Sequence, residues 1–197
     1  MSNLPVDPKQ PVTWLKQVPN QLTLLRIGAI PILLLLYPLS KSLGPLCAVI
    51  FAAAAITDFL DGWIARRYGT VTAIGSLLDP IADKMLIGAA LVLLASSDAL
   101  PVFLAGLLIC RDIGVNGLRM VALEQKIVIE VRDVGKWKTV FQSLGIFCLF
   151  ISKPLFEIRF REIGMVCIWI ALFLSLYSAW SYGKSYWQSI KSQEKNF

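Results

Sequence analysis

The sequence predicts an all-α, polytopic integral membrane protein: a bundle of six transmembrane helices preceded by a short N-terminal amphipathic helix at the membrane surface. The mean hydropathy is +0.67, and 56% of the residues are hydrophobic while 16% are charged. These values are typical of neither a soluble domain nor a disordered chain. Apolar runs also alternate with short polar connections, and positive charge gathers in alternate connections. The 197 residues suit one membrane domain without a separate soluble domain.

The first element is a short amphipathic stretch at residues 11–19, in which Val12, Trp14 and Leu15 alternate with polar Lys16. Such a stretch is expected to lie along the membrane surface. The expected organisation is a single domain over residues 1–197, with a juxtamembrane segment at 1–19, a six-helix core at 20–183 and a cytoplasmic tail at 184–197.

The six spanning helices are expected at the six apolar runs. The runs at 22–39, 100–118 and 163–182 approach the roughly 20 residues that a spanning helix needs. The other three runs are shorter, so their helices must continue into polar neighbours at the cytoplasmic ends. These shorter runs lie at 43–56, 85–95 and 139–151.

Positive charge predicts which connections face the cytoplasm. The segment between the fifth and sixth runs fits least well, because Lys153, Arg159 and Arg161 place positive charge on the expected outer face. The net charge of +6 indicates anionic lipid head groups rather than nucleic acid, because the basic residues form no continuous stripe. The expected cytoplasmic cations are Lys9, Lys16 and Arg26 before the first helix, Arg66, Arg67 and Lys84 between the second and third, Arg119, Lys126, Arg132, Lys136 and Lys138 between the fourth and fifth, and Lys184, Lys191 and Lys195 in the tail.

Four aspartates, Asp58, Asp61, Asp79 and Asp83, lie at the polar ends of the second and third helices. The first pair is three residues apart and the second pair four, so each pair shares one helix face. If the two helices are neighbours, the carboxylates converge, and like charges about 4 Å apart repel by roughly 4 kcal/mol per pair at moderate dielectric. Divalent cations remove that cost, and oxygen ligands in a chain without histidine favour Mg²⁺ or Mn²⁺. Two such ions are the usual arrangement for phosphoryl displacement, so the sequence points to phosphate chemistry.

These acids and the small residues between them follow one pattern, DxxDGxxAR, eight residues, then GxxxDxxxD. The small residues allow either a flat group such as a nucleobase to approach the backbone or helices to pack tightly in lipid. The pattern resembles the signature of the CDP-alcohol phosphatidyltransferase family, and it is specific because it fixes residue types and intervals across two helices. The matching residues are Asp58, Asp61, Gly62, Ala65, Arg66, Gly75, Asp79 and Asp83.

The resemblance implies that an alcohol hydroxyl attacks the β-phosphorus of CDP-diacylglycerol and releases CMP. It implies two divalent ions, Mg²⁺ or Mn²⁺, held by Asp58, Asp61 and Asp79, with Asp83 as both a ligand and the catalytic base. It also implies a CDP-diacylglycerol site at Asn20, Gly62, Ala65, Arg66, Thr72 and Gly75.

Other stretches, at residues 19–26 and 135–142, resemble the family members that use glycerol 3-phosphate as the acceptor. Arg111 lies in an apolar run and therefore needs a polar cavity or a partner, while Asp112 stands where many relatives have glutamate, a conservative departure that affects fine positioning. The acceptor phosphate is expected to bind the cations at the cytoplasmic ends of the fourth and fifth helices, although some of these, Lys138 among them, are also explained as topology charges. The four candidates are Arg111, Arg119, Lys136 and Lys138.

Two alternatives stay open. One is a member of the same family with phosphatidylglycerol, an inositol phosphate or serine as acceptor, although an uncharged acceptor would leave the clustered cations without a binding partner. A divalent-cation channel or transporter would use the aspartates as its ion path, but no acidic relay continues through the other spans. The expected setting is the inner (cytoplasmic) cell membrane with the active site facing the cytoplasm. The expected partners are CDP-diacylglycerol, glycerol 3-phosphate, membrane lipids and, by resemblance, a second copy in a homodimer, with no nucleic acid.

Overall fold

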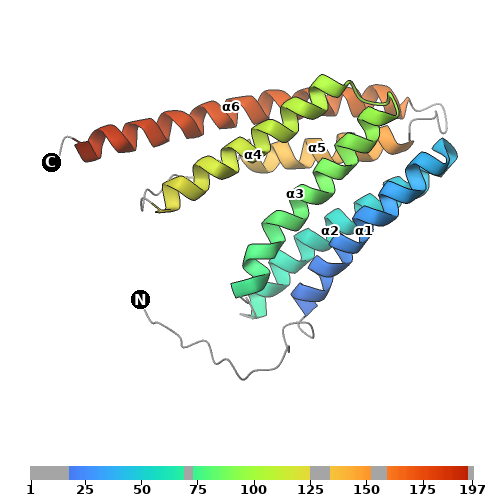
Figure 1. The fold of residues 1–197 in the computed structure, drawn as a ribbon, viewed down its shortest axis with the longest axis horizontal. Helices are drawn as coiled ribbons and strands as arrows, with labels where there is room; N and C mark the ends of the chain where they lie inside the picture. Colours follow the sequence, from blue (N-terminus) through green and yellow to red (C-terminus); the bar gives the residue numbers. More distant parts are fainter. Residues whose placement is uncertain (1–17, 69–72, 125–133, 152–158, 195–197) are drawn as a thin grey trace.

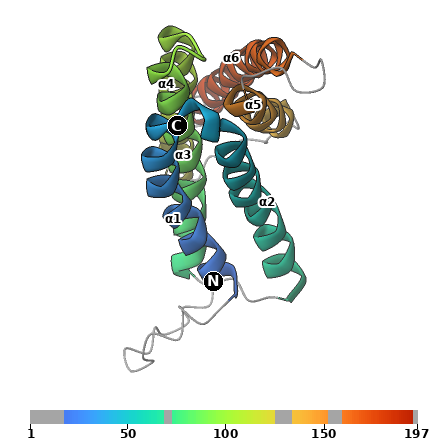
Figure 2. The same ribbon diagram turned by 90° about the vertical axis from the view of Figure 1, so that its right-hand side faces the viewer.

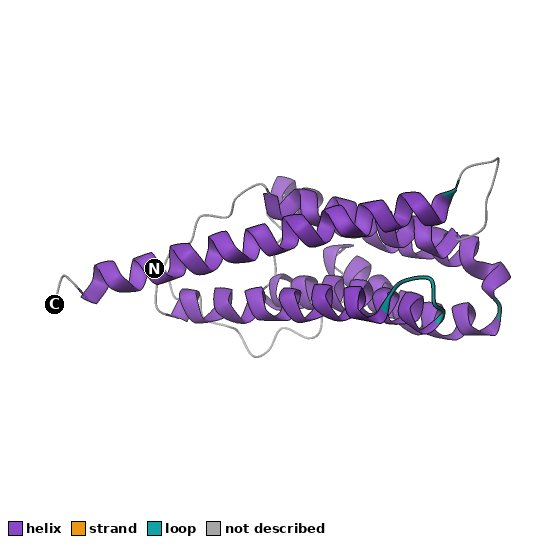
Figure 3. Cartoon of the chain, turned by 90° about the horizontal axis from the view of Figure 1, so that it is seen from above, coloured by secondary structure: helices purple, strands orange, loops and turns teal. Residues whose placement is uncertain are grey.

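The structure, a computed structural model, describes residues 18–68, 73–124, 134–151 and 159–194. In these ranges the chain is helical, with short loops and no strand (Figure 3), which confirms the predicted all-α class. The elements are α1 Val18–Leu39, the 3₁₀ turn η2 Lys41–Leu43, α2 Gly44–Tyr68, α3 Ala73–Ser96, α4 Val102–Glu124, α5 Val134–Ile151 and α6 Phe160–Glu194.

The helices with short apolar runs do continue into polar sequence. α2 extends past residue 56 to Tyr68, α3 begins at Ala73 rather than 85, and α5 begins at Val134 rather than 139. The added turns of α2 and α3 carry the four aspartates, so these acids lie within helices. Asp79 was expected to cap a helix that starts at Pro80; this is wrong, because α3 already begins at Ala73. At the other end of the chain, α6 continues through the expected tail to Glu194.

The N-terminal boundary differs from the prediction. α1 begins at Val18, so Pro19 lies in the first turn, where its missing N–H costs no helical hydrogen bond. Arg26 was predicted to precede the first helix; this is wrong, because it lies inside α1 and its side chain is fully buried. α1 contacts both α2 and α3, so the apolar sequence around Arg26 carries this arginine into the bundle. Most of the expected amphipathic stretch, residues 11–17, lies outside the described residues.

The connections predicted to face outward meet at one end of the molecule. The Tyr37 hydroxyl, near the end of α1, lies 3.2 Å from the Ser97 hydroxyl in the α3–α4 connection. Arg161, at the start of α6, donates a hydrogen bond of 3.3 Å to the carbonyl oxygen of Asp98 in that same connection. Arg161, one of the poorly fitting positive charges, therefore lies beside the weakly charged α3–α4 connection, as an up-and-down order of helices requires.

An aromatic core closes this end. Phe150 of α5 makes an edge-on contact with Tyr37, with ring centroids 5.0 Å apart, and its centroid lies 6.0 Å from that of Phe51 in α2. Such contacts stabilise by about 0.5–1.5 kcal/mol beyond simple burial. Around them lie fully buried leucines from the neighbouring helices, among them Leu33, Leu91 and Leu94.

α5 and α6 cross where two glycines face each other. A Cβ on Gly164 would lie 2.8 Å from Cγ of Leu149 and 3.0 Å from the carbonyl oxygen of Gly145. A Cβ on Gly145 would lie 2.9 Å from the Ile168 side chain. Only a residue without a side chain fits such an approach, which is a common device for helix packing in membranes.

Away from the common end the helices spread. α1 and α3 stay side by side while α2 runs away from them towards its C-terminal end (Figure 2). α4 and α6 lie side by side, and α3 diverges from α4 (Figure 1). This divergence exposes the polar faces of the middle of α3 and the C-terminal half of α4.

One helix in the described part of the chain is long and apolar enough to cross a membrane by itself: residues Phe160–Lys191 of α6, where 33% of the most apolar window is buried within the protein. Shorter apolar stretches, Leu24–Leu39 and Gly44–Thr57, lie in α1 and α2. The structure thus confirms the six helices and contains one clear candidate for a membrane span among the described residues.

Candidate active site

A cavity of about 390 Å³ opens between four helices, α3, α4, α5 and α6. It lies where α3 and α4 diverge, and the first turns of α5 and the second half of α6 complete its wall. The lining residues are Asp83, Lys84 and Ile87 of α3, Arg111, Asp112, Val115, Asn116 and Arg119 of α4, Gly135, Lys136, Lys138 and Thr139 of α5, and Ser178 and Tyr182 of α6.

Helical spacing accounts for this convergence. On α4 the lining residues Arg111, Val115 and Arg119 are four positions apart, and on α6 the same interval separates Ser178 from Tyr182. Residues at this interval share one helix face. One polar face of α4 and one of α6 therefore point into the same space, although the rest of both helices is mostly apolar.

Asp112 lies at the centre of the cavity's charges. The Lys138 ammonium donates to both carboxylate oxygens of Asp112, at 2.6 and 2.5 Å, and a terminal nitrogen of Arg111 lies 3.0 Å from Oδ1. Arg111 Nε also donates to the carbonyl oxygen of Ser175 in α6, at 2.8 Å. The exposed fractions of the Lys138, Arg111 and Asp112 side chains are 7%, 12% and 16%, so this is a shielded network and not a surface ion pair.

These contacts settle two questions that the sequence left open. Arg111 was predicted to need a polar cavity or a partner, and it has both, which confirms the prediction. For Lys138, a topology charge was the competing interpretation. The side chain is instead buried against Asp112, so Lys138 is not a solvated rim charge.

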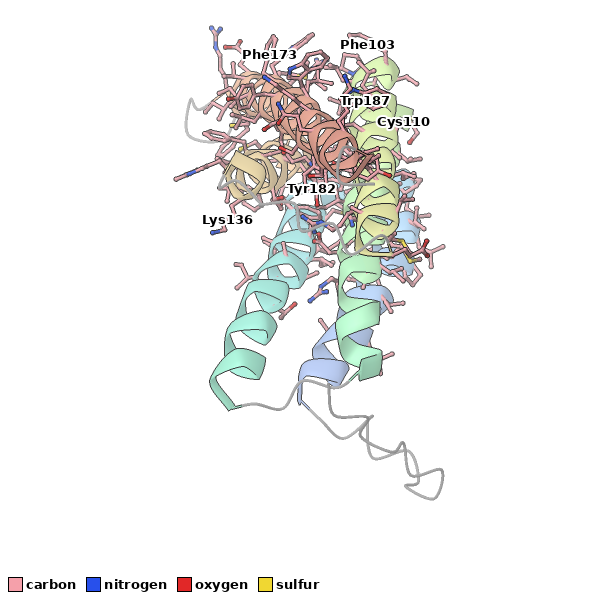
Figure 4. All side chains as sticks on the ribbon, turned by 90° about the vertical axis from the view of Figure 1, so that its left-hand side faces the viewer. Phe103, Cys110, Lys136, Phe173, Tyr182 and Trp187 are labelled. Atoms are coloured by element: carbon pink, nitrogen blue, oxygen red, sulfur yellow. The ribbon has the colours of Figure 1, made fainter. Side chains whose placement is uncertain are left out.

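Arg119 and Lys136 form a more open part of the wall. Arg119 is exposed, and its guanidinium lies 5.9 Å from the Tyr182 ring centroid with Nε 3.4 Å from the Tyr182 hydroxyl. In Figure 4, Lys136 and Tyr182 lie on the side of α5 and α6 that faces α2 and α3, whereas Phe173 lies on the opposite side of α6. The polar face of this helix pair is thus turned towards the helices that carry the aspartates.

All four predicted acceptor-phosphate residues therefore line one cavity, together with Asp83, the predicted base. Asp83 is partly exposed in the wall formed by α3. Among the described residues, five cationic and two anionic side chains line the space, so this part of the wall carries net positive charge and favours an anionic ligand. The cations are Lys84, Arg111, Arg119, Lys136 and Lys138, and the anions are Asp83 and Asp112.

The structure places only the backbone of the other predicted metal ligands. Asp58 and Asp61 lie on α2 and Asp79 lies on α3, and these two helices contact each other. The side chains of these three aspartates lie outside the described part of the structure, so the ligand set stays a prediction.

The same limit applies to the predicted CDP-diacylglycerol site. Thr72 lies outside the described residues, and only the backbone of the other five is placed. Asn20 lies on α1, Gly62, Ala65 and Arg66 on α2, and Gly75 on α3.

Sequence reasoning missed several lining residues. Lys84 was counted among the topology charges, and Asp112 was noted only as a departure from relatives. A signal for Asp112 was present, because a carboxylate beside an arginine in an apolar run requires partners. Ser178 and Tyr182 carried no such signal, since serine and tyrosine are common along apolar helices and only the packing of α6 on α4 brings them to the cavity.

Comparison with known proteins agrees with the motif. Residues 16–177 match the model of the CDP-alcohol phosphatidyltransferase family. The chain is 37% identical to the CDP-diacylglycerol–glycerol-3-phosphate 3-phosphatidyltransferase of Rickettsia typhi, over 87% of this chain and 97% of the relative. It is 32% identical to the protein of the same name from Bacillus subtilis, over 89% of this chain and 97% of the relative. This chain therefore belongs to the CDP-alcohol phosphatidyltransferase family.

Proposed function

We propose that this enzyme transfers the phosphatidyl group from CDP-diacylglycerol to sn-glycerol 3-phosphate, giving phosphatidylglycerophosphate and CMP. The reaction would supply phosphatidylglycerol and cardiolipin synthesis. The names of the relatives support this reaction. The observation that carries it is the cavity in which Asp83 of α3 shares the wall with the cations of α4 and α5.

The cationic wall accounts for the choice of acceptor. A phosphate dianion gains charge-assisted hydrogen bonds from arginine and lysine, and binding it there would hold the glycerol near Asp83. Asp83 then accepts the proton of the attacking hydroxyl. The hydroxyl oxygen forms a bond to the β-phosphorus of CDP-diacylglycerol, the bond from that phosphorus to the bridging oxygen breaks, and CMP leaves with the electron pair.

The donor set fits a divalent metal. The candidate ligands Asp58, Asp61, Asp79 and Asp83 offer only carboxylate oxygens, which suit Mg²⁺ and Mn²⁺, and membership of the family supports a divalent-metal requirement. When bound, two such ions would neutralise the diphosphate of CDP-diacylglycerol. The cations of the cavity wall are proposed to bind the acceptor phosphate, so they do not replace the metal ions at the diphosphate.

The lipid substrate is proposed to bind beside these acids. Gly62, Ala65 and Gly75 would let the nucleotide approach the backbone, Arg66 would pair with phosphate oxygens, and Asn20 and Thr72 would add polar contacts. The support is the family motif together with the position of these residues on α1, α2, α3 and the segment between α2 and α3. CMP titration of the Arg66→Ala variant, which should bind more weakly than the wild type, tests this part.

The proposed setting is the cytoplasmic membrane, spanned six times, with the cavity on the cytoplasmic side. α6 has 35 residues and is therefore about 52 Å long, which exceeds a hydrocarbon core of about 30 Å. Its C-terminal part, with Tyr182, would then extend into the cytoplasm. Each helix also exposes large apolar side chains suited to lipid; examples are Leu35, Val49, Val92, Phe103, Val140 and Phe173.

Labelling tests this topology. Single cysteines at Asp98 and at Lys136, in a background without the native cysteines, should react with an impermeant maleimide from outside and from inside the cell, respectively. Reaction of both from the same side would contradict six spans. A homodimer is also proposed, by family resemblance, and light scattering of the purified protein after subtraction of detergent mass tests it.

The reaction itself is tested with purified protein, CDP-diacylglycerol and Mg²⁺. CMP release should depend on added glycerol 3-phosphate and should stop when EDTA removes the metal. Absence of acceptor-dependent CMP release across several detergents and both metals would overturn the proposal. A cation transporter, the alternative from another class, finds no support in the matches, which are to transferases.

A further inference from the structure

The network around Asp112 holds two of the five cations that line the cavity. Lys138 and Arg111 both contact the Asp112 carboxylate and are shielded from solvent. Of the others, Arg119 and Lys136 are exposed and Lys84 is half-buried. Lys138 and Arg111 therefore form a fixed pair of cations in the wall of the acceptor pocket.

The two cations of the fixed pair come from different helices, and both contact Asp112. The Lys138 ammonium approaches Asp112 from α5, and Arg111 reaches it from the preceding residue of α4. The Ser175 carbonyl of α6 holds Nε of Arg111. The remaining terminal nitrogen of this guanidinium has no hydrogen-bond partner among the described residues, so it keeps donor capacity for an anion.

A carboxylate in a phosphate-binding cavity weakens binding, because it repels the dianion. Asp112 can offset this repulsion by holding the cations that bind the phosphate. A buried lysine without a counter-charge is costly, and two long cationic side chains lose rotamer freedom when they bind a ligand. A carboxylate that already holds both removes much of that cost before the acceptor arrives.

We propose that Asp112 is a positioning residue for the acceptor phosphate: it holds Lys138 and Arg111 as the fixed wall of the pocket without itself binding the substrate. This inference rests on the proposed function. Asp112 is expected to act on glycerol 3-phosphate binding and not on CDP-diacylglycerol binding, because the two side chains that it contacts, Arg111 and Lys138, lie on α4 and α5.

The first test is the Asp112→Asn variant, assayed by CMP release with each substrate varied in turn. The KM for glycerol 3-phosphate should rise at least about tenfold, as expected when one partner of a buried charge pair is removed. The KM for CDP-diacylglycerol should change less than about twofold. Asp112→Glu, which keeps the charge, should restore most of the acceptor KM. Glu162→Gln is the matched control, because it breaks the exposed Arg159–Glu162 pair at the other end of the molecule, and it should leave both KM values unchanged.

A double-variant cycle separates positioning from general stability. If Asp112 acts through its cations, Asp112→Asn should raise the acceptor KM by a smaller factor in a Lys138→Met background than in the wild type. The double variant also removes the unpaired ammonium of Lys138, while Arg111 keeps its hydrogen bond to the Ser175 carbonyl, so it is expected to fold even if Asp112→Asn does not. If Asp112→Asn does not fold, three other variants test the inference. Lys138→Met and the double variant should have similar acceptor KM values. Asp112→Glu should have an acceptor KM near that of the wild type.

Three outcomes would overturn the inference: equal rises in both KM values, full additivity of the two substitutions, or a wild-type acceptor KM in Asp112→Asn. None of these would be confused with failure of the proposed function, because that failure would appear in the wild-type protein as CMP release that does not depend on glycerol 3-phosphate.

Discussion

The guanidinium of Arg119 lies 5.9 Å from the ring centroid of Tyr182, with Nε 3.4 Å from its hydroxyl, so a residue of α6 supports a cation of α4 at the cavity wall. The contact joins positions 63 residues apart in the sequence. A cation over an aromatic ring at an exposed site gains about 0.5–1 kcal/mol, which is enough to favour one orientation of the arginine.

The first prediction follows from this contact. Tyr182→Ala should raise the KM for glycerol 3-phosphate by about two- to fivefold, in line with the loss of a contact of this size, and Tyr182→Phe should have a smaller effect because the ring remains. Tyr177→Ala is the matched control, since Tyr177 is an exposed tyrosine on the same helix that does not line the cavity. Equal effects at the two positions would show that α6 responds to loss of any tyrosine.

The second prediction concerns the base. Asp83→Asn should lower kcat at least about a hundredfold, the lower range for general-base catalysis, because an amide cannot accept the hydroxyl proton. Asp98→Asn serves as the control: Asp98 lies at the opposite end of α3 with a φ of 59°, a conformation that asparagine tolerates. Steady-state CMP release measures both variants, and substantial turnover by Asp83→Asn would exclude this residue as the base.

The third prediction concerns the crossing of α5 and α6. Gly164→Ala should destabilise the protein by about 1–3 kcal/mol, because the new Cβ would lie 2.8 Å from Leu149 Cγ and 3.0 Å from the Gly145 carbonyl oxygen. Gly106→Ala in α4 has open space at its Cβ and should be neutral or stabilising by up to about 1 kcal/mol. Thermal unfolding in detergent compares the two; a Gly164→Ala protein as stable as the wild type would mean that the helices separate without cost.

The fourth prediction concerns Gln142, one helical turn beyond Lys138 on α5. Its side chain is fully buried, and neither amide atom has a hydrogen-bond partner in the described part of the structure. A buried polar group without a partner costs roughly 1–3 kcal/mol, so Gln142→Met should raise the melting temperature. A lower melting temperature would instead indicate that the amide has a partner in solution.

The sequence predicts the helices of this protein better than it predicts their contacts. Hydropathy located the six helices, and the need for spanning length correctly extended α2, α3 and α5 into polar sequence. The positive-charge rule misplaced Arg26, because this rule assigns arginines by sequence position and takes no account of burial inside a packed bundle.

The candidate site was predictable to the extent that its residues carry unusual chemistry. Arg111 and Lys138 stood out as cations beside or within apolar sequence, and the structure brings both to one cavity with Asp83. The role of Asp112 and the presence of Tyr182 were not predictable, because both depend on the spacing of helices distant in sequence. Tyrosine is common along apolar helices, and Asp112 signalled only that it requires partners, not which residues these are.

The central claim is that the cations beside Asp83 select glycerol 3-phosphate as the acceptor, and a competition assay tests it most directly. Purified enzyme would receive CDP-diacylglycerol, Mg²⁺ and equal concentrations of glycerol 3-phosphate, phosphatidylglycerol, inositol 1-phosphate and serine, and mass spectrometry would identify the lipid products. Phosphatidylglycerophosphate is expected as the dominant product, with its share falling in Arg111→Gln and Lys138→Met variants. Cardiolipin, phosphatidylserine or an inositol lipid as the main product of the wild-type enzyme would contradict the claim.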